Sequence, residues 1–286
     1  MKEKFFDAVI FDLDGVITKT AVVHSAAWKE MFNNYLKYRS EKYNEEFREF
    51  THEDDYLPYV DGKPRYKGVA DFLASRGIDI PYGDPSDSDD KETVCGLGNL
   101  KNSVFNDVLS RKGAEVYDST LRLIKELKKN RIKLGVASSS KNCRQVLESV
   151  GLLDYFETRV DGVVSAKSGL KGKPEPDIFT TACDNLGVSY HRAVVIEDAV
   201  SGVQAGRKGK FGMVLGIARE GNIMDLRING ADVVAEDVEE LGGIAGINEW
   251  FKTGLIDDQW SDSYPDYNTE PEKAREALLT TGNGFF

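Results

Sequence analysis

Five short, continuous runs of apolar residues constrain the fold of this chain more than any other feature. They do not alternate with polar residues, so both faces of each predicted strand are expected to be buried. Helical patterns lie between them, at 119–130, 142–150 and 176–187. Strands that alternate with helices predict an α/β fold, with an open parallel sheet covered by helices on both faces. The predicted strands are residues 5–11, 132–138, 193–197, 212–217 and 231–235.

A long segment after the first strand breaks this alternation. Residues 24–38 and 99–111 have helical patterns, and the acidic stretch 81–92 is expected to be a solvated loop. A helical block at this position predicts a cap inserted into the sheet domain. The predicted domains are a core of residues 1–19 and 111–255, a helical cap of residues 20–110, and an extension of residues 256–286, which is rich in Asp, Ser, Tyr and Pro.

The charge of the chain excludes two classes of partner. The sequence has 37 Lys and Arg against 48 Asp and Glu, a formal net charge of −11. Such a surface repels nucleic acids and anionic lipids, and no apolar run reaches the roughly 20 residues that span a bilayer. The three cysteines form no CxxC motif, which indicates a reducing compartment. Because Asp7, Asp12 and Asp14 interrupt the apolar N-terminus, no signal peptide is expected, and we expect a cytoplasmic protein.

Two carboxylates, Asp12 and Asp14, come directly after the first predicted strand, and Gly15 follows them. Ligands of open α/β sheets bind at the carboxyl ends of the strands, and the glycine lets the chain turn away there. Taken alone, two acids and a glycine are also ordinary turn residues.

Three further segments, two of them at strand ends, favour a ligand-binding site over an ordinary turn. The second strand runs into a hydroxyl-rich turn before a helix, which can bind an anion, and Lys173 lies in a proline-rich turn before another helix. Two adjacent acids after a buried strand suit a hard cation. Together the residues suit phosphoryl transfer through a carboxylate nucleophile. They are Ser138, Ser139, Ser140, Lys141 and Asn142 in the turn, Lys173, and the acids Glu197 and Asp198.

The motifs DLDG, SSSKN, GKPEPD and EDAVSG, in this order, resemble the haloacid dehalogenase-type phosphotransferases, and among them β-phosphoglucomutases. The resemblance covers residues 5 to about 250 and implies a Rossmann-like core with a helical cap. It implies that Asp12 is the nucleophile and Asp14 the general acid/base, with the Asp14 backbone carbonyl on Mg²⁺. Ser138 and Lys173 would hold the transferring phosphoryl group, with Ser139, Ser140, Lys141 and Asn142 beside it. The acids Glu197 and Asp198 would complete a metal site with Asp12 and Asp14.

The same resemblance assigns two residues near the start of the cap. Thr20 and His24 would contact the general acid/base and the hinge of the cap. His24 could instead be a helix residue whose neighbours satisfy it. Lys19 departs from the pattern, which usually has Asp there, so the details of the hinge are expected to differ.

A second cap segment, YVDGKPR at 59–65, resembles the loop that selects the substrate. In it Gly62 precedes Arg65, whose guanidinium would bind the phosphate that is not transferred, because its fork matches phosphate oxygens. Asp61 stands where the family has Lys, and Lys63 could substitute for that Lys. Lys101 would be a further substrate contact. The alternative for Arg65 is a solvated turn residue.

These assignments favour a Mg²⁺-dependent β-phosphoglucomutase that interconverts β-D-glucose 1-phosphate and glucose 6-phosphate through an aspartyl-phosphate. A mutase needs a second anion site because its intermediate is a bisphosphate. One alternative is a sugar-phosphate phosphatase, if water reaches the aspartyl-phosphate. Another is a docking module for an attached enzyme. The tail, from Trp260 to Phe285, resembles the start of inverting α-glucoside phosphorylases, so fusion to or association with a disaccharide phosphorylase is expected.

Overall fold

One six-stranded parallel sheet organises the protein. The computed structural model describes residues 5–263, of which Lys112 and residues 254–263 are described by their backbone alone. The strand order is β3-β2-β1-β4-β5-β6, with every pairing parallel. This confirms the predicted α/β fold class. The strands are β1 (Ala8–Phe11), β2 (Lys133–Ala137), β3 (Thr158–Val160), β4 (Ala193–Glu197), β5 (Met213–Ile217) and β6 (Val233–Ala235).

All five predicted strands are present, and one strand was missed. β3 has only three residues, one of which is the charged Arg159, so it leaves no apolar run in the sequence. It forms an edge of the sheet and pairs with β2 alone among the described strands. A strand with one neighbour needs less apolar surface than a central one, which explains why the pattern is weak.

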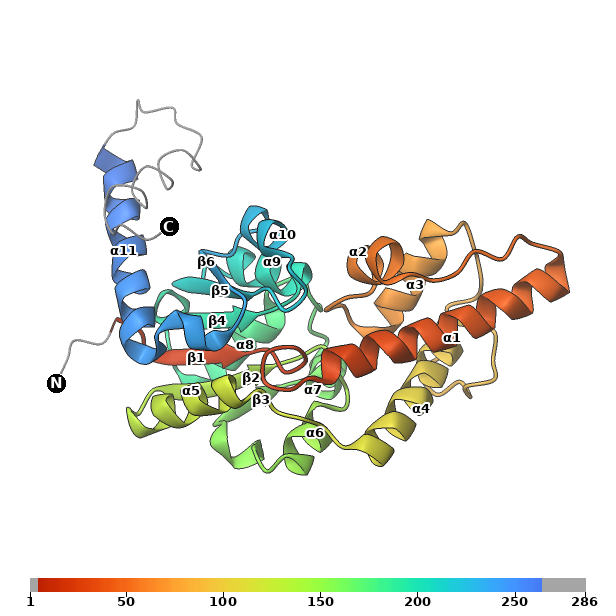
Figure 1. The fold of residues 1–286 in the computed structure, drawn as a ribbon, viewed down its shortest axis with the longest axis horizontal. Coiled ribbons are helices and arrows are strands. Elements are labelled where there is room, and N and C mark those ends of the chain that lie inside the picture. Colours follow the sequence, from red (N-terminus) through yellow and green to blue (C-terminus); the bar gives the residue numbers. More distant parts are fainter. Residues whose placement is uncertain (1–4, 264–286) are drawn as a thin grey trace.

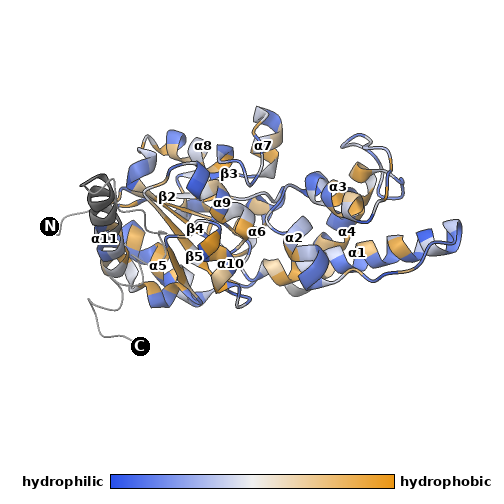
Figure 2. Cartoon of the chain, turned by 90° about the horizontal axis from the view of Figure 1, so that it is seen from above, coloured by the Kyte–Doolittle hydropathy of each residue, from blue (hydrophilic) through white to orange (hydrophobic). Residues whose placement is uncertain are grey.

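Alternating residues of the central strand fill two separate cores. Val9 and Phe11 pack with one helical layer, and Ala8 and Ile10 pack with the other. Figure 2 shows the apolar strands between helices that are polar on their outer faces. The first layer contains α5 (Asp118–Lys129), α6 (Cys143–Ser149) and α11 (Gly243–Ser263), and the second contains α7 (Gly162–Ser168), α8 (Asp177–Leu186), α9 (Val200–Lys208) and α10 (Ile223–Ile228). Short turns of helix, η2 (Leu153–Tyr155), η3 (Tyr190–Arg192) and η4 (Val238–Leu241), connect these elements.

A helical block, called the cap below, extends beyond the carboxyl ends of the strands (Figure 1). It has a hydrophobic core of its own, in which the Phe32 ring lies 4.1 Å from that of Phe72 and 5.0 Å from that of Phe50. A separate core is the property expected of an inserted domain. The cap consists of α1 (Thr20–Tyr43), η1 (His52–Tyr56), α2 (Leu57–Tyr59), α3 (Arg65–Ser75) and α4 (Val94–Lys112).

The ends of α1, α4 and α11 can be compared with the predicted domain boundaries at residues 20, 110 and 255. α1 begins at Thr20, where the cap was predicted to begin, and α4 ends two residues after the predicted end at 110. α11 runs through the predicted boundary at 255 to Ser263. Residues 264–286, which carry most of the predicted extension, lie outside the described residues. Among residues 5–263, no helix is long and apolar enough to cross a membrane.

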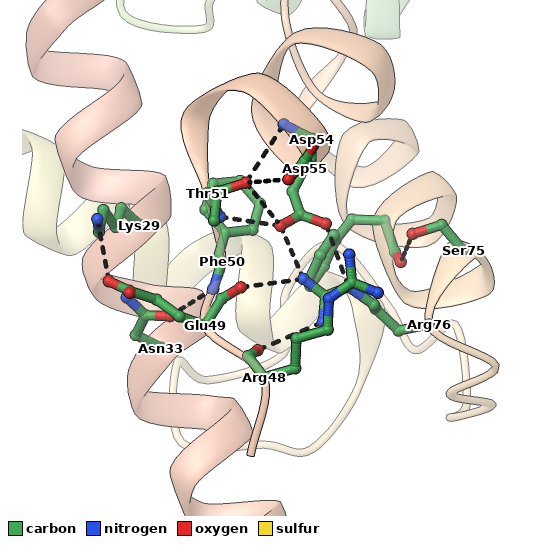
Figure 3. Close-up of polar contacts among 11 residues, drawn as sticks. Lys29, Asn33, Arg48, Glu49, Phe50, Thr51, Asp54, Asp55, Ser75 and Arg76 are labelled. Carbon is green, nitrogen blue, oxygen red and sulfur yellow. Dashed lines mark hydrogen bonds and ion pairs between the residues drawn. The ribbon is translucent and has the colours of Figure 1, made fainter. Parts of the chain in front are cut away.

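A buried ion pair holds the cap loop before η1 (Figure 3). Arg76, just after α3, donates from Nη2 to Asp55 Oδ2 at 2.7 Å and from Nε to Oδ1 at 3.1 Å. Asp55 also accepts from the backbone N–H of Thr51 at 2.8 Å, and its side chain is 3% exposed. Arg76 donates further to the carbonyls of Arg48 and Glu49. This cluster fixes η1, in which Asp55 and Tyr56 are buried.

We predict that Arg76→Met lowers the free energy of unfolding by about 3–5 kcal/mol, because it leaves the buried Asp55 carboxylate without its cation. Urea unfolding followed by circular dichroism measures the change. Arg144→Met is the matched control, since the Arg144–Glu148 pair is exposed on α6 and should contribute at most about 1 kcal/mol. Equal losses in both variants would contradict the role of the pair.

Candidate active site

The register of three strands brings the predicted site residues to one edge of the sheet. Phe11 of β1 pairs with Val136 of β2 and with Ile196 of β4. The next residue along each strand is Asp12, Ala137 and Glu197, and Ser138 follows directly on β2. Parallel strands all end at the same edge, so the acids and the hydroxyl-rich turn meet there.

A buried lysine is the centre of this edge. The Lys173 ammonium donates to Asp12 Oδ1 at 2.5 Å and to Glu197 Oε1. The side chains of Lys173 and Glu197 are almost completely buried, at 1% and 0% exposed, and that of Asp12 is 7% exposed. Glu197 Oε2 accepts the backbone N–H groups of Asp198 and Ala199 at 2.9 and 2.8 Å. Both oxygens of Glu197 are therefore engaged within the protein.

The electrostatics of the cluster leave an excess of negative charge. Burial alone would lower the pKa of Lys173, but the carboxylates of Asp12 and Glu197 raise it above its ordinary value, so the ammonium stays charged. Burial raises the pKa of Asp12, and the charges of Glu197 and Asp14 raise it further against the effect of Lys173. Burial and the Glu197 charge also raise the pKa of Asp198. One ammonium does not balance these acids, and a divalent cation would.

The second acid of the first motif contacts the cap. Thr20 donates from Oγ1 to Asp14 Oδ1, and His24 Nε2 lies 3.4 Å from the same oxygen. Both residues are on α1. Burial alone would raise the pKa of Asp14, but the nearby imidazole of His24 and the hydroxyl of Thr20 lower it. Asp14 is therefore ionised in this arrangement.

Lys101 of α4 reaches the same corner of the cap. Its ammonium contacts His24 Nδ1 and lies 5.0 Å from the centres of the Trp28 and Phe105 rings. The His24 ring stacks on Phe105 at 4.0 Å. Burial lowers the pKa of Lys101, and the positive charge of Arg65 lowers it further. The charged form of Lys101 is therefore disfavoured, and a bound anion would stabilise it.

Hydrogen bonds through the Asn102 side chain join Arg65 of the cap to the hydroxyl-rich turn of the core. Arg65 Nη2 donates to Asn102 Oδ1 at 2.6 Å, and Asn142 Nδ2 donates to the same oxygen at 2.9 Å. Lys141 lies beside them, with its ammonium 4.7 Å from the Tyr66 ring centre. Arg65 of the cap and Lys141 of the core turn thus line the same cavity as Asp12.

The three serines of the turn have different partners. Ser138 and Ser140 accept backbone N–H groups within the turn, from Ser140 and Asn142 respectively. Ser139 Oγ donates to the carbonyl of Gly62 in the cap at 2.8 Å. Gly62 has a φ of +65°, and a Cβ there would lie 2.3 Å from Ser201 Oγ. A glycine at this position lets the cap loop lie directly on the core.

One cavity between the cap and the core collects almost all of the predicted site residues. The two that do not line it are Thr20, which donates to the lining residue Asp14, and Asn142, which is linked to the lining residue Arg65 through Asn102. The cavity walls also contain residues to which the sequence analysis gave no site role, chiefly Tyr56, Asp61 and Trp28. Lys63, suggested there as a substitute cation, lines the cavity but donates to Asp71 Oδ2 at 2.9 Å. The only sequence signal for Asp61 was its departure from the family residue beside Gly62.

Asp198 lies against the turn of the first motif. A Cβ on Gly15 would lie 1.7 Å from Asp198 Oδ2, and Gly15 has a φ of +86°. In residues 5–263, no three His, Cys, Asp or Glu side chains form a cluster that could hold a metal ion by themselves. Mg²⁺ needs fewer, because it is commonly bound by one or two carboxylates together with waters and phosphate oxygens. The pair Asp12 and Asp198, beside a turn carbonyl, fits that donor set.

Comparisons with known proteins show the family to which this chain is similar. The family model described as haloacid dehalogenase-like hydrolase matches residues 6–210. A β-phosphoglucomutase of Mycobacterium bovis is 47% identical over 82% of this chain and 90% of that protein. An uncharacterized glycosyl hydrolase of Mycobacterium tuberculosis is 37% identical over 82% of this chain, but over only 17% of its own length. The crystal structure of a β-phosphoglucomutase from Clostridium difficile has the same fold, with a TM-score of 0.68 at 23% identity, covering 88% of this chain and 99% of that chain.

Asp61 gives this site a pH dependence of stability. Burial raises the pKa of its carboxyl from 3.8 to about 7, and the charges of Glu197 and Glu220 add to this against a hydrogen bond from Tyr56. A pKa that is higher in the folded state stabilises the protein at low pH, and this contribution is lost as pH rises towards 7.

We therefore predict that, without added metal, Asp61→Asn raises the melting temperature more at about pH 8 than at about pH 4.5, because the charged form of Asp61 is destabilising only at the higher pH. Differential scanning fluorimetry at both pH values measures it. Asp107→Asn removes an exposed carboxylate of α4 and serves as the control. The same change in melting temperature at both pH values for Asp61→Asn would contradict the assignment.

Proposed function

This chain belongs to the haloacid dehalogenase-like hydrolase family, and we propose that it acts as a β-phosphoglucomutase on β-D-glucose 1-phosphate and glucose 6-phosphate. The observation that carries the proposal is the single cavity with Asp12 and Lys173 on its core side and Arg65 on its cap side. A bisphosphate needs a cation at each end, and a phosphatase has less need of the second one. The relative at 47% identity with this name supports the same activity.

The proposed reaction transfers a phosphoryl group through Asp12. The phosphorylated Asp12 gives its phosphoryl group to a sugar hydroxyl, and Asp14 accepts the proton of that hydroxyl. The resulting β-glucose 1,6-bisphosphate then reorients, so that its other phosphate faces Asp12. The Asp12 carboxylate then forms a bond to the other phosphorus, the bond from that phosphorus to its sugar oxygen breaks, and Asp14 returns the proton to the oxygen. Asp14 must be ionised to accept the proton in the first step, and the lowering of its pKa keeps it ionised.

Lys173 and Arg65 have complementary roles in this proposal. Lys173, with Ser138, neutralises the phosphoryl group that is being transferred, and Glu197 holds Lys173 in place. Arg65, supported by Asn102, binds the other phosphate. Lys101, Ser139, Ser140 and Lys141 supply the remaining polar contacts of the cavity, and Asn142 supports Arg65 through Asn102. Thr20 and His24 hold the Asp14 carboxyl toward the substrate.

We propose that Asp12, Asp198 and the backbone carbonyl of Asp14 hold Mg²⁺. When bound, the ion would neutralise charge on the phosphoryl oxygens. Glu197, which the sequence analysis also assigned to the metal, is here assigned to Lys173, because both of its oxygens are engaged within the protein.

Two proposals concern the cellular context. Association with a disaccharide phosphorylase remains a proposal from the tail sequence, and it is supported by a relative in which the matched region is 17% of a glycosyl hydrolase. A cytoplasmic location is supported by Cys95, Cys143 and Cys183, which are all free and buried.

We predict that Asp12→Asn abolishes mutase turnover, because an amide does not attack phosphorus. Phosphorus NMR measures the conversion, with Mg²⁺, β-glucose 1-phosphate and a trace of glucose 1,6-bisphosphate. The unmodified protein should form glucose 6-phosphate with little inorganic phosphate, and Asp107→Asn should match it. Growth of inorganic phosphate instead would identify a phosphatase, and substantial turnover by Asp12→Asn would overturn the nucleophile.

We predict that Arg65→Ala lowers kcat/KM for the mutase reaction by about 10- to 150-fold, which corresponds to the loss of charged hydrogen bonds worth about 1.5–3 kcal/mol. Hydrolysis of p-nitrophenyl phosphate, which has no second phosphate, should change much less. Lys67→Ala removes an exposed cation of the same helix and should leave both activities unchanged. Equal losses in the two reactions would argue against Arg65 as the second phosphate site.

A further inference from the structure

We propose that Arg219 is a positioning residue that holds together the two linkers between the cap and the core. The adjacent Glu220 contacts the cap and fixes its position relative to Asp12, Asp14 and Asp198. The linkers are residues 12–19, which carry Asp14, and residues 113–117. The proposal deepens the proposed function and rests on it for its kinetic readout only. Its structural readout needs no substrate.

The two linkers are hydrogen-bonded to each other. Tyr117 N–H donates to the Ile17 carbonyl at 3.0 Å, and Lys19 N–H donates to the Glu115 carbonyl at 2.8 Å. Within the first linker, Gly15 N–H donates to the Thr18 carbonyl at 2.7 Å. Any movement of the cap relative to the core must therefore strain or move this pair as a unit.

One core side chain contacts both linkers. Arg219, in the loop after β5, donates from Nε to the Gly15 carbonyl at 3.2 Å, and its guanidinium lies 3.8 Å from the centre of the Tyr117 ring. Its Nη1 donates to Asp237 Oδ2 at 2.5 Å, and Asp237 in turn accepts the hydroxyl of Ser119. Arg219 is thus anchored in the core while it holds the backbone next to Asp14.

The residues after Arg219 reach the cap and the acid loop. Glu220 Oε2 lies 2.5 Å from His52 Nε2 of η1, and His52 Nδ1 is 2.9 Å from Ser25 Oγ of α1. Asn222 Nδ2 donates to the Asp198 carbonyl at 3.4 Å. Three residues within the segment 219–222 therefore touch both linkers, the cap and the loop of Glu197 and Asp198.

One nitrogen of the Arg219 guanidinium is not used in these contacts. Its Nη2 atom is buried and bonds to no side chain or backbone atom among the described residues. The guanidinium can therefore follow the Gly15 carbonyl over a short shift of the linker without leaving Asp237. This is what a clamp needs if the cap moves during turnover.

The clamp should act on chemistry more than on binding. Gly15 is next to Asp14, so a loose Gly15 carbonyl lets the proton-transferring carboxyl leave its position against Thr20 and His24. A displacement of about 1 Å can cost about 100-fold in rate. Arg219 does not line the substrate cavity, so substrate binding should be nearly unaffected.

The test compares Arg219→Gln with Arg122→Gln. Arg122 is an exposed core arginine that pairs with Glu239 and touches neither linker. Hydrogen exchange of peptides covering 13–19 and 113–117 reads linker order, and kcat and KM for the mutase reaction read positioning. We expect faster linker exchange and a kcat lower by about 10- to 100-fold, with KM within about threefold, in Arg219→Gln alone.

Arg219→Lys keeps a cation near Asp237 but not the fork, so both readouts should fall between those of Arg219→Gln and the unmodified protein. It also carries the test if Arg219→Gln does not fold. Linker exchange and kcat equal to those of Arg122→Gln would overturn the proposal. If the unmodified protein shows no mutase turnover, the proposed function fails, while the exchange comparison still decides whether Arg219 clamps the linkers.

Discussion

The contact of the buried Lys173 ammonium with Asp12 and Glu197 is the constraint on which the site depends. A buried carboxylate without a partner would be protonated or would destabilise the fold, and here several acids share one edge of the sheet. Lys173 lets Asp12 remain close to Glu197 in an interior that is nearly closed to water. A buried ion cluster of this kind is weak evidence for stability. Its value lies in a charge distribution that suits a phosphate group and a metal ion.

That cluster exists because of strand register rather than because of any local motif. Lys173 is 161 residues from Asp12 in the sequence, and parallel pairing of β1 with β4 brings the similarly remote Glu197 beside Asp12. The continuous apolar runs make this register strongly determined, since both faces of each central strand are buried. The same two cores therefore hold the sheet together and align the acids.

Much of this could be predicted from the sequence, and the remainder could not for identifiable reasons. Buried strands that end in acids or hydroxyls are visible as patterns, so the core motifs and the inserted helical block were predictable. β3 was not, because a three-residue edge strand with Arg159 has no apolar run. Asp61 and Tyr56 reach the cavity only through the packing of the cap. The contacts of Arg219 with Gly15 and Tyr117 join positions about 100 to 200 residues apart, and no spacing rule reports them.

The separate hydrophobic core of the cap has a consequence for how such a protein can diverge. Because Phe32, Phe50 and Phe72 are packed among cap residues alone, the cavity wall that Arg65, Asp61 and Trp28 form can change without disturbing the sheet. Substitutions there alter which molecule fits, whereas the acids and Lys173 at the strand ends remain as they are. In the proposed function, selectivity can thus change through this wall of the cap, as long as Thr20 and His24 keep their contacts with Asp14.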